Sequence, residues 1–111
     1  MEGGMEKGIM VFTNLPDSDI ARSIARSLID ERLAACVNIL PAMQSIYRWQ
    51  GAVEEAGEVA VVIKTTEGLY PQVEAAIVKL HPYDIPEILA LPIVAGLPAY
   101  LDWIKSETKT R

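Results

Sequence analysis

The sequence has one cysteine and one histidine, and both shortages limit its chemistry. A lone cysteine, Cys36, cannot form a disulfide within the chain, so a disulfide framework is excluded and a reducing cytoplasm fits. A lone histidine, His81, has no second His or Cys at a ligand spacing. Zinc and copper sites in proteins need several such ligands, so a metal site built from one chain has little support in the sequence.

Basic residues and long apolar runs are also scarce. The chain has 10 Lys and Arg against 15 Asp and Glu, a net charge of -5, whereas nucleic-acid-binding proteins need clustered basic residues. No apolar run approaches the roughly 18 residues that cross a bilayer, and the start, MEGGMEKG, lacks the apolar segment of a signal peptide. We therefore expect a cytoplasmic protein without nucleic-acid or membrane partners, for which cations are the more natural ligands.

Motifs of catalysis are missing as well. The sequence contains no phosphate loop, dinucleotide fingerprint, nucleophile elbow or zinc-protease helix. Cys36 lies in a strand-like stretch with no neighbouring base or cation, which favours a packed thiol over a nucleophile. A hydrolase or transferase would need the fold to bring Cys36 and His81 together. We expect no enzyme and no required cofactor.

Half of the 111 residues are hydrophobic, which predicts one domain over residues 8–111 behind a loose, Gly-rich leader, residues 1–7. The periodicity predicts the following elements: strand 8–13, a helix starting at 17–19, a long strand from 34 with a bulge at Pro41, a hairpin tip over 51–58, strand 58–65, a helix from Pro71 to Leu80, edge strand 85–94 and a short helix over 97–107. This order is the split βαβ pattern of ferredoxin-like α+β domains, with an antiparallel sheet.

The predicted strand 58–65 is apolar on both faces, with Val59, Val61 and Ile63 on one and Ala60 and Val62 on the other. Two helices cover only one face of a four-stranded sheet, so the second face is exposed in a monomer. The final helix, at about ten residues, spans only about 15 Å. We therefore expect other copies of the chain to cover this face.

His81 ends a predicted helix, because Pro82 disfavours helical geometry in the residue before it. The negative end of the helix dipole favours a protonated imidazole there, in an exposed corner. Two interpretations remain, a helix cap and a metal ligand. In an oligomer, one histidine per chain can also meet its symmetry mates or the carboxylate of another chain.

Other residues are candidates for a binding cleft. The carboxylates of Glu54, Glu55 and Glu58 either attract hard cations or form a solvated turn that discourages edge pairing. Four aromatic residues with polar tips suit a pocket wall, a subunit interface or an ordinary core: Tyr47, Trp49, Tyr83 and Trp103. Lys64 interrupts an apolar strand and is a candidate partner for a carboxylate such as Glu87.

Four stretches, ERLAACVNILPAMQSIYRWQGAVEE, EVAVVIKTT, HPYDIPEILALPI and YLDWI, resemble the CutA family, the divalent-cation tolerance proteins. The resemblance runs from about Ile9 to Ile104, and LAACVNILP and HPYxxPE are its most specific parts. It implies a ferredoxin-like subunit in a tight homotrimer, similar in architecture to the PII signalling proteins, with clefts between subunits.

In bacterial members of that family, copper and other divalent ions are associated with a cysteine and two adjacent histidines. The second histidine matches His81, but Leu80 stands at the first position and Phe12 at the cysteine. The resemblance therefore implies only His81 as a metal ligand, with copper or another divalent cation as its ion. Cys36 matches the cysteine of LAAC, which looks structural.

The leading hypothesis is a cytoplasmic, homotrimeric, non-enzymatic protein of divalent-cation tolerance that binds copper through His81. Its intersubunit cleft is lined by Trp49, Lys64, Tyr83 and Glu87. The rival hypothesis is a PII-like small-molecule-sensing or adaptor trimer, in which the same cleft takes an anionic metabolite or a loop of a partner and metal is incidental.

Overall fold

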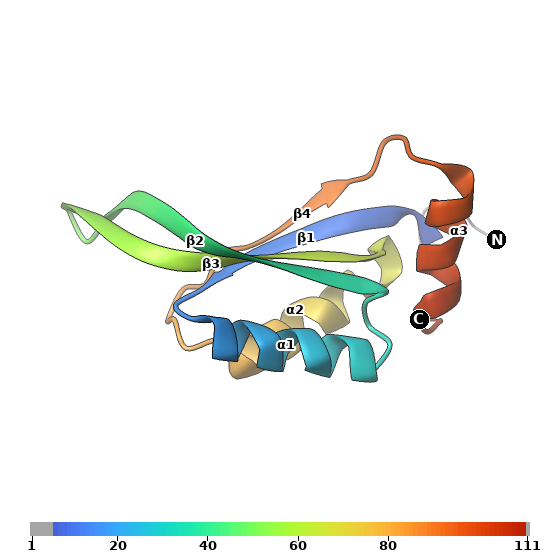
Figure 1. The fold of residues 1–111 in the computed structure, drawn as a ribbon, viewed down its shortest axis with the longest axis horizontal. Coiled ribbons are helices and arrows are strands. Elements are labelled where there is room, and N and C mark those ends of the chain that lie inside the picture. Colours follow the sequence, from blue (N-terminus) through green and yellow to red (C-terminus); the bar gives the residue numbers. More distant parts are fainter. Residues whose placement is uncertain (1–5, 111) are drawn as a thin grey trace.

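The computed structural model describes residues 6–110 (Figure 1). Its elements are β1 (Gly8–Leu15), α1 (Ser18–Asp30), β2 (Cys36–Trp49), β3 (Ala52–Thr66), the short 3-10 helix η2 (Glu67–Leu69), α2 (Tyr70–Leu80), β4 (Ile88–Pro92) and α3 (Pro98–Glu107). Of the predicted leader, residues 1–5 lie outside the described residues, and the carbonyl of Lys7 accepts a hydrogen bond from the amide of Glu67 at 2.8 Å. Among residues 6–110, no helix has the length and apolar character to span a membrane.

The sheet has the strand order β2-β3-β1-β4, and every neighbouring pair is antiparallel. Helices α1 and α2 lie side by side on one face of it (Figure 1). This confirms the predicted α+β fold with a split βαβ order. Strand β4 pairs only with β1, so it is an edge strand, where its final Pro92 costs no ladder hydrogen bond.

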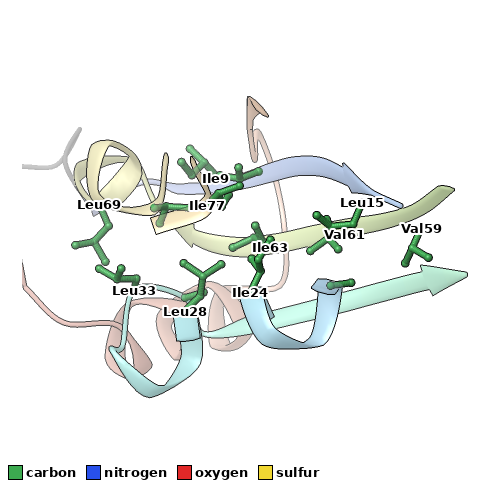
Figure 2. Packing of buried hydrophobic residues seen from close by; sticks show 14 residues of the cluster. Ile9, Leu15, Ile24, Leu28, Leu33, Val59, Val61, Ile63, Leu69 and Ile77 are labelled. Atoms are coloured by element: carbon green, nitrogen blue, oxygen red, sulfur yellow. The ribbon is translucent and has the colours of Figure 1, made fainter. Parts of the chain in front are cut away.

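The core lies between the sheet and these two helices. Alternate residues of β1 and β3 point toward the helices, and Figure 2 shows Leu15, Val61 and Ile63 packed against side chains such as Ile24 of α1 and Ile77 of α2. All five of these side chains are at most 1% exposed. Because successive strand residues alternate between faces, the apolar odd-numbered positions of β3 fix which face the helices cover.

Local signals place the helix ends. The side chain of Asp17 accepts a hydrogen bond from the amide of Ile20 at 2.9 Å and caps the start of α1. Pro71 lies in the first turn of α2, where its missing N–H is not needed. At the other end, His81 is extended, with φ -76° and ψ 132°, and Pro82 follows it.

The predicted hairpin tip over 51–58 is wrong. Strand β3 already begins at Ala52, and the turn consists of Gln50 and Gly51, which have φ of 51° and 84°. Two successive residues with positive φ match the twist of a tight hairpin, so the strands stay paired almost to the tip. The acidic stretch suggested a loop, but cross-strand pairing overrides that preference. The predicted bulge is confirmed by a register shift between Leu40 and Met43.

The second face of the sheet is largely uncovered within the chain. Helix α3 packs at one end of the sheet, against β3 and β1, and buries Ile104 (Figure 1). Elsewhere large apolar side chains stay open to solvent: Leu40 is 48%, Leu89 56% and Leu91 51% exposed. We call this surface the open face. A single chain leaves it uncovered, as the sequence predicts, and its covering by other copies stays a prediction.

Thr13 of β1 offers a test of the core. Its side chain is fully buried, and its hydroxyl has no hydrogen-bond partner among the described residues. We expect Thr13→Val to raise the free energy of unfolding by about 1 kcal/mol, because it removes an unsatisfied polar group at nearly constant shape. Urea denaturation at one fixed protein concentration measures the change.

Thr65 provides the matched control. It is equally buried, but its hydroxyl donates a hydrogen bond to the carbonyl of Leu33 at 2.6 Å. Thr65→Val leaves that carbonyl without its partner and should lower the free energy of unfolding by about 1 to 3 kcal/mol. Equal losses in the two variants would show that the hydroxyl of Thr13 has a partner in solution.

Candidate functional site

His81 is the centre of the candidate site, and both of its ring nitrogens are engaged. Its Nε2 lies 2.8 Å from the carbonyl oxygen of Asn14, at the end of β1. Its Nδ1 accepts a hydrogen bond from the amide of Tyr83 at 3.3 Å. Since a carbonyl only accepts, Nε2 carries the proton and the ring is the neutral tautomer. No lone pair of this ring is left free for a metal ion.

The burial of His81 corrects two expectations. The side chain is 9% exposed, so it does not lie in an exposed corner. Burial lowers its pKa below the ordinary value of 6.5, while the bond to Asn14 and the charge of Glu58 act in the opposite direction. The imidazole is therefore neutral at pH 7, because the loss of solvation outweighs the hydrogen bond to Asn14 and the charge of Glu58.

Tyr83 ties the segment after α2 to the sheet. Its hydroxyl donates a hydrogen bond to Oε2 of Glu58 on β3 at 2.8 Å, and its ring lies against that of His81 with centroids 4.9 Å apart. Burial raises the pKa of Tyr83 to about 12, helped by the hydrogen bond and charge of Glu58. Tyr83 therefore stays a neutral donor at physiological pH.

Asn14 holds the same region from the other side. Its backbone carbonyl faces His81, while its side-chain Nδ2 donates to Oε1 of Glu87 at 3.2 Å. Glu87 directly precedes β4, whose first residue, Ile88, pairs with Thr13 of β1. One residue thus orients both the histidine and a carboxylate, because the end of β1 passes beside the loop between α2 and β4.

Asn14, Tyr83 and Glu87, but not His81, line a cavity of about 660 Å³ between that loop and the part of the β2–β3 hairpin beyond the bulge. We call it the hairpin cavity. Its lining residues are Asn14, Ser45, Ile46, Tyr47, Trp49, Glu58, Pro82, Tyr83, Asp84, Ile85 and Glu87. Three of the four residues predicted to share a cleft, Trp49, Tyr83 and Glu87, meet here within one chain. Whether this cleft lies between subunits stays a prediction.

Lys64, the fourth, lies elsewhere. It pairs with Met10 near the start of β1, whereas Asn14 and Glu87 lie at the other end of that strand. Its Nζ donates to Oδ1 of Asn38 at 2.8 Å and sits 5.9 Å from the centroid of the Tyr100 ring. The suggested Lys64–Glu87 pair therefore does not form within the chain, because the antiparallel register separates the two.

Cys36 is also remote from His81. It pairs with Lys64 at the far end of β3, and its Sγ lies 3.8 Å from Oδ1 of Asn38. No Cys–His pair for nucleophilic catalysis is therefore assembled in the described chain. Within residues 6–110, no three His, Cys, Asp or Glu side chains come close enough together to hold a metal ion. The described part of one chain therefore offers no complete metal centre, and the role of His81 as a ligand stays a prediction.

Sequence reasoning missed Asn14, and it assigned Glu58 to a solvated turn. Glu58 shares its face of β3 with Lys64, because even-numbered positions point away from the helices. That alternation was a usable signal for placing Glu58 on the open face. The contact between Asn14 and His81 joins residues 67 apart and has no local signature.

Comparison with known proteins settles the family. A model of the CutA1 divalent ion tolerance protein family matches residues 9–107. The chain belongs to this family. The divalent-cation tolerance protein CutA of Thermus thermophilus is 48% identical over 99 residues, which are 89% of this chain and 96% of that protein. The solved structure of CutA1 from Oryza sativa, 38% identical, matches with a TM-score of 0.92 and covers 98% of this chain and 100% of that one.

Relatives of greater length exist in animals. Protein CutA of Mus musculus is 41% identical over 99 residues, which are 89% of this chain but 56% of the mouse protein. This CutA1 chain therefore spans about half the length of that relative. The family names describe tolerance to divalent cations and no catalysed reaction.

Proposed function

We propose that the protein is a non-enzymatic, homotrimeric binding protein that supports tolerance to divalent cations, copper among them. Family membership supports the class of function. The open face carries the proposal of association, because Leu40, Leu89 and Leu91 leave large apolar side chains about half exposed on one face of the sheet, and exposed apolar patches mark interaction surfaces. The number three is what the resemblance to the CutA family implies, a homotrimer similar in architecture to the PII proteins.

Metal binding, in this proposal, belongs to the assembly. One chain supplies acidic groups around the hairpin cavity, Glu58, Asp84 and Glu87, but no three-ligand site among its described residues. His81 reaches a metal ion only if its bond to Asn14 or Tyr83 opens. Ligands from neighbouring copies must therefore complete any site.

Equilibrium dialysis against copper, followed by elemental analysis, tests the proposal. We expect the assembled protein to retain copper above the buffer level, and we expect Leu89→Glu, a variant designed to separate the copies, to lose most of it. Leu89 is on the open face and does not line the cavity, so the substitution leaves the cavity's own residues unchanged. Equal retention by the separated chain, or no retention by the assembly, would contradict an intersubunit metal site.

A second function is favoured by the cavity itself. Its volume of about 660 Å³ and its mixed aromatic and polar lining are typical of small-molecule sites. We infer that a small molecule, and not only an ion, binds there. The lining contains no Lys or Arg, so the anionic metabolite expected with Lys64 is not the ligand that this cavity favours.

We also propose a cytoplasmic location. Cys36 is the only cysteine of the sequence and is half-buried, so it gains nothing from an oxidising compartment. Cell fractionation with antibody detection tests this location. Recovery of the protein in a periplasmic or other exported fraction would refute it.

A further inference from the structure

The charged residues that line the hairpin cavity all have the same sign. They are Glu58, Asp84 and Glu87, contributed by β3 and by the loop before β4. Aromatic side chains complete the wall: Tyr47 and Trp49 come from β2, and Tyr83 comes from the same loop before β4. A cavity that combines carboxylates with aromatic faces attracts cations through both, because the faces of aromatic rings carry negative potential.

Two of these carboxylates are held in place by hydrogen bonds from neutral groups. Glu58 accepts its hydrogen bond from the hydroxyl of Tyr83, and Glu87 accepts its bond from the amide of Asn14. Both donors are neutral, so they orient the carboxylates without bringing a positive charge to the cavity. Among residues 6–110 the ion pair of the structure, Lys105 with Asp102, lies on α3 and not at the cavity.

We propose that the hairpin cavity binds a small organic cation, a primary ammonium or guanidinium group on a short apolar chain. This inference rests on the proposed small-molecule function and names its ligand class. The cationic group pairs with Glu58 and Glu87, and the apolar chain lies along Trp49 and Tyr47. About 660 Å³ lies within the usual range of roughly 300 to 1,000 Å³ for such ligands.

The same geometry separates an organic cation from its competitors. A bare divalent ion needs several ligand atoms converging at about 2 Å, and no three acidic, His or Cys side chains of the described chain converge in that way. An anion needs a basic group, and Lys64 lies at the other end of the sheet. An alkyl ammonium needs only one or two carboxylates and a ring face, which the cavity supplies.

Isothermal titration calorimetry of the full chain with agmatine, in chelator-treated buffer of low ionic strength, tests the proposal. We expect saturable binding that weakens as sodium chloride is added, because the attraction is electrostatic. Glu87→Gln and Glu58→Gln should each weaken binding at least about tenfold, the loss of one charge-assisted contact. Glu87 is exposed, so its variant should remain folded even if loss of the Tyr83 contact disturbs Glu58→Gln.

Glu55→Gln is the matched control. It removes the same charge from the same strand, three residues from Glu58, at a position that does not line the cavity. Its affinity for agmatine should equal that of the parent protein. Two probes of similar length complete the design: neutral 1,4-butanediol and anionic succinate, neither of which should bind.

Each outcome decides one question. Absence of saturable agmatine binding, or equal binding by Glu87→Gln, Glu58→Gln and the parent, would overturn the cationic class. Saturable binding of succinate without binding of agmatine would also overturn the cationic class, but it would still support a small-molecule function. No binding of any of the three probes would contradict both the cationic ligand class and the small-molecule function. Because the buffer has been freed of divalent metal, this result is independent of copper binding in dialysis.

Discussion

Leu89→Glu is expected to convert the assembled protein into monomers of about 12 kDa in sedimentation velocity at micromolar concentration. Leu89 lies on the open face, opposite Phe12 of β1, and is 56% exposed in the single chain. If other copies cover this face, the substitution places a carboxylate in an apolar interface without a partner. Burying an unpaired charge costs several kcal/mol, enough to weaken association more than a hundredfold.

Val78→Glu controls for charge and hydrophobicity. Val78 is 53% exposed on α2, on the outer side of the helix layer and away from the open face. This variant should sediment like the parent protein, and both variants should keep the same far-ultraviolet circular dichroism. A parent protein that sediments only as a monomer, or a Leu89→Glu protein that remains assembled, would contradict burial of the open face between copies.

The sequence sufficed to predict this open face because its cause is local. Val59, Val61 and Ile63 alternate with Ala60 and Val62, and a strand with apolar residues on both sides needs two covers. The two helices cover one of these faces. Their ends could also be predicted from the sequence, from the capping residue Asp17 and from Pro82.

The hairpin was misjudged for a physical reason. Glu54 and Glu55 were taken as turn residues because of their charge, but both pair with β2 partners, Tyr47 and Ile46. The half of the hairpin beyond the bulge extends past the helices, as Figure 1 shows, so no core dictates its pattern. Only the positive φ of Gln50 and Gly51 marks the turn, and composition does not reveal φ at a glutamine.

The candidate site could be predicted only in part. The aromatic tips and carboxylates of the cavity could be listed, but which of them meet depends on strand register. The register brings Asn14 to His81 and sends Lys64 to the opposite end of β1. Charge state followed from burial, which the sequence does not give, so the dipole argument for a protonated His81 failed.

His81→Phe is expected to lower the free energy of unfolding at pH 7.5 by about 2 kcal/mol or more. The substitution keeps an aromatic ring beside Tyr83 but removes both nitrogens, which leaves the carbonyl of Asn14 and the amide of Tyr83 without partners. Each buried, unsatisfied group costs about 1 to 3 kcal/mol. Urea denaturation at fixed protein concentration measures the loss.

The same variant should abolish a specific pH dependence. Unfolded His81 takes up a proton near pH 6.5, whereas the folded chain takes it up only at lower pH, because burial depresses the pKa. Between these values the unfolded state binds more protons, so the stability from neutral His81 is complete above pH 6.5 and is lost as the pH falls toward the folded pKa. The parent protein should therefore lose stability on acidification from pH 6.5 to 5.

This pH dependence can be assigned to His81 because the sequence has no other histidine. His81→Phe should remove most of the change in the free energy of unfolding between pH 6.5 and 5. Leu80→Ala, a change at the preceding residue, which is 41% exposed, should keep the slope and shift stability by no more than about 1 kcal/mol. A slope of the opposite sign in the parent protein would show that folded His81 is protonated, and that a carboxylate such as Glu58 outweighs its burial.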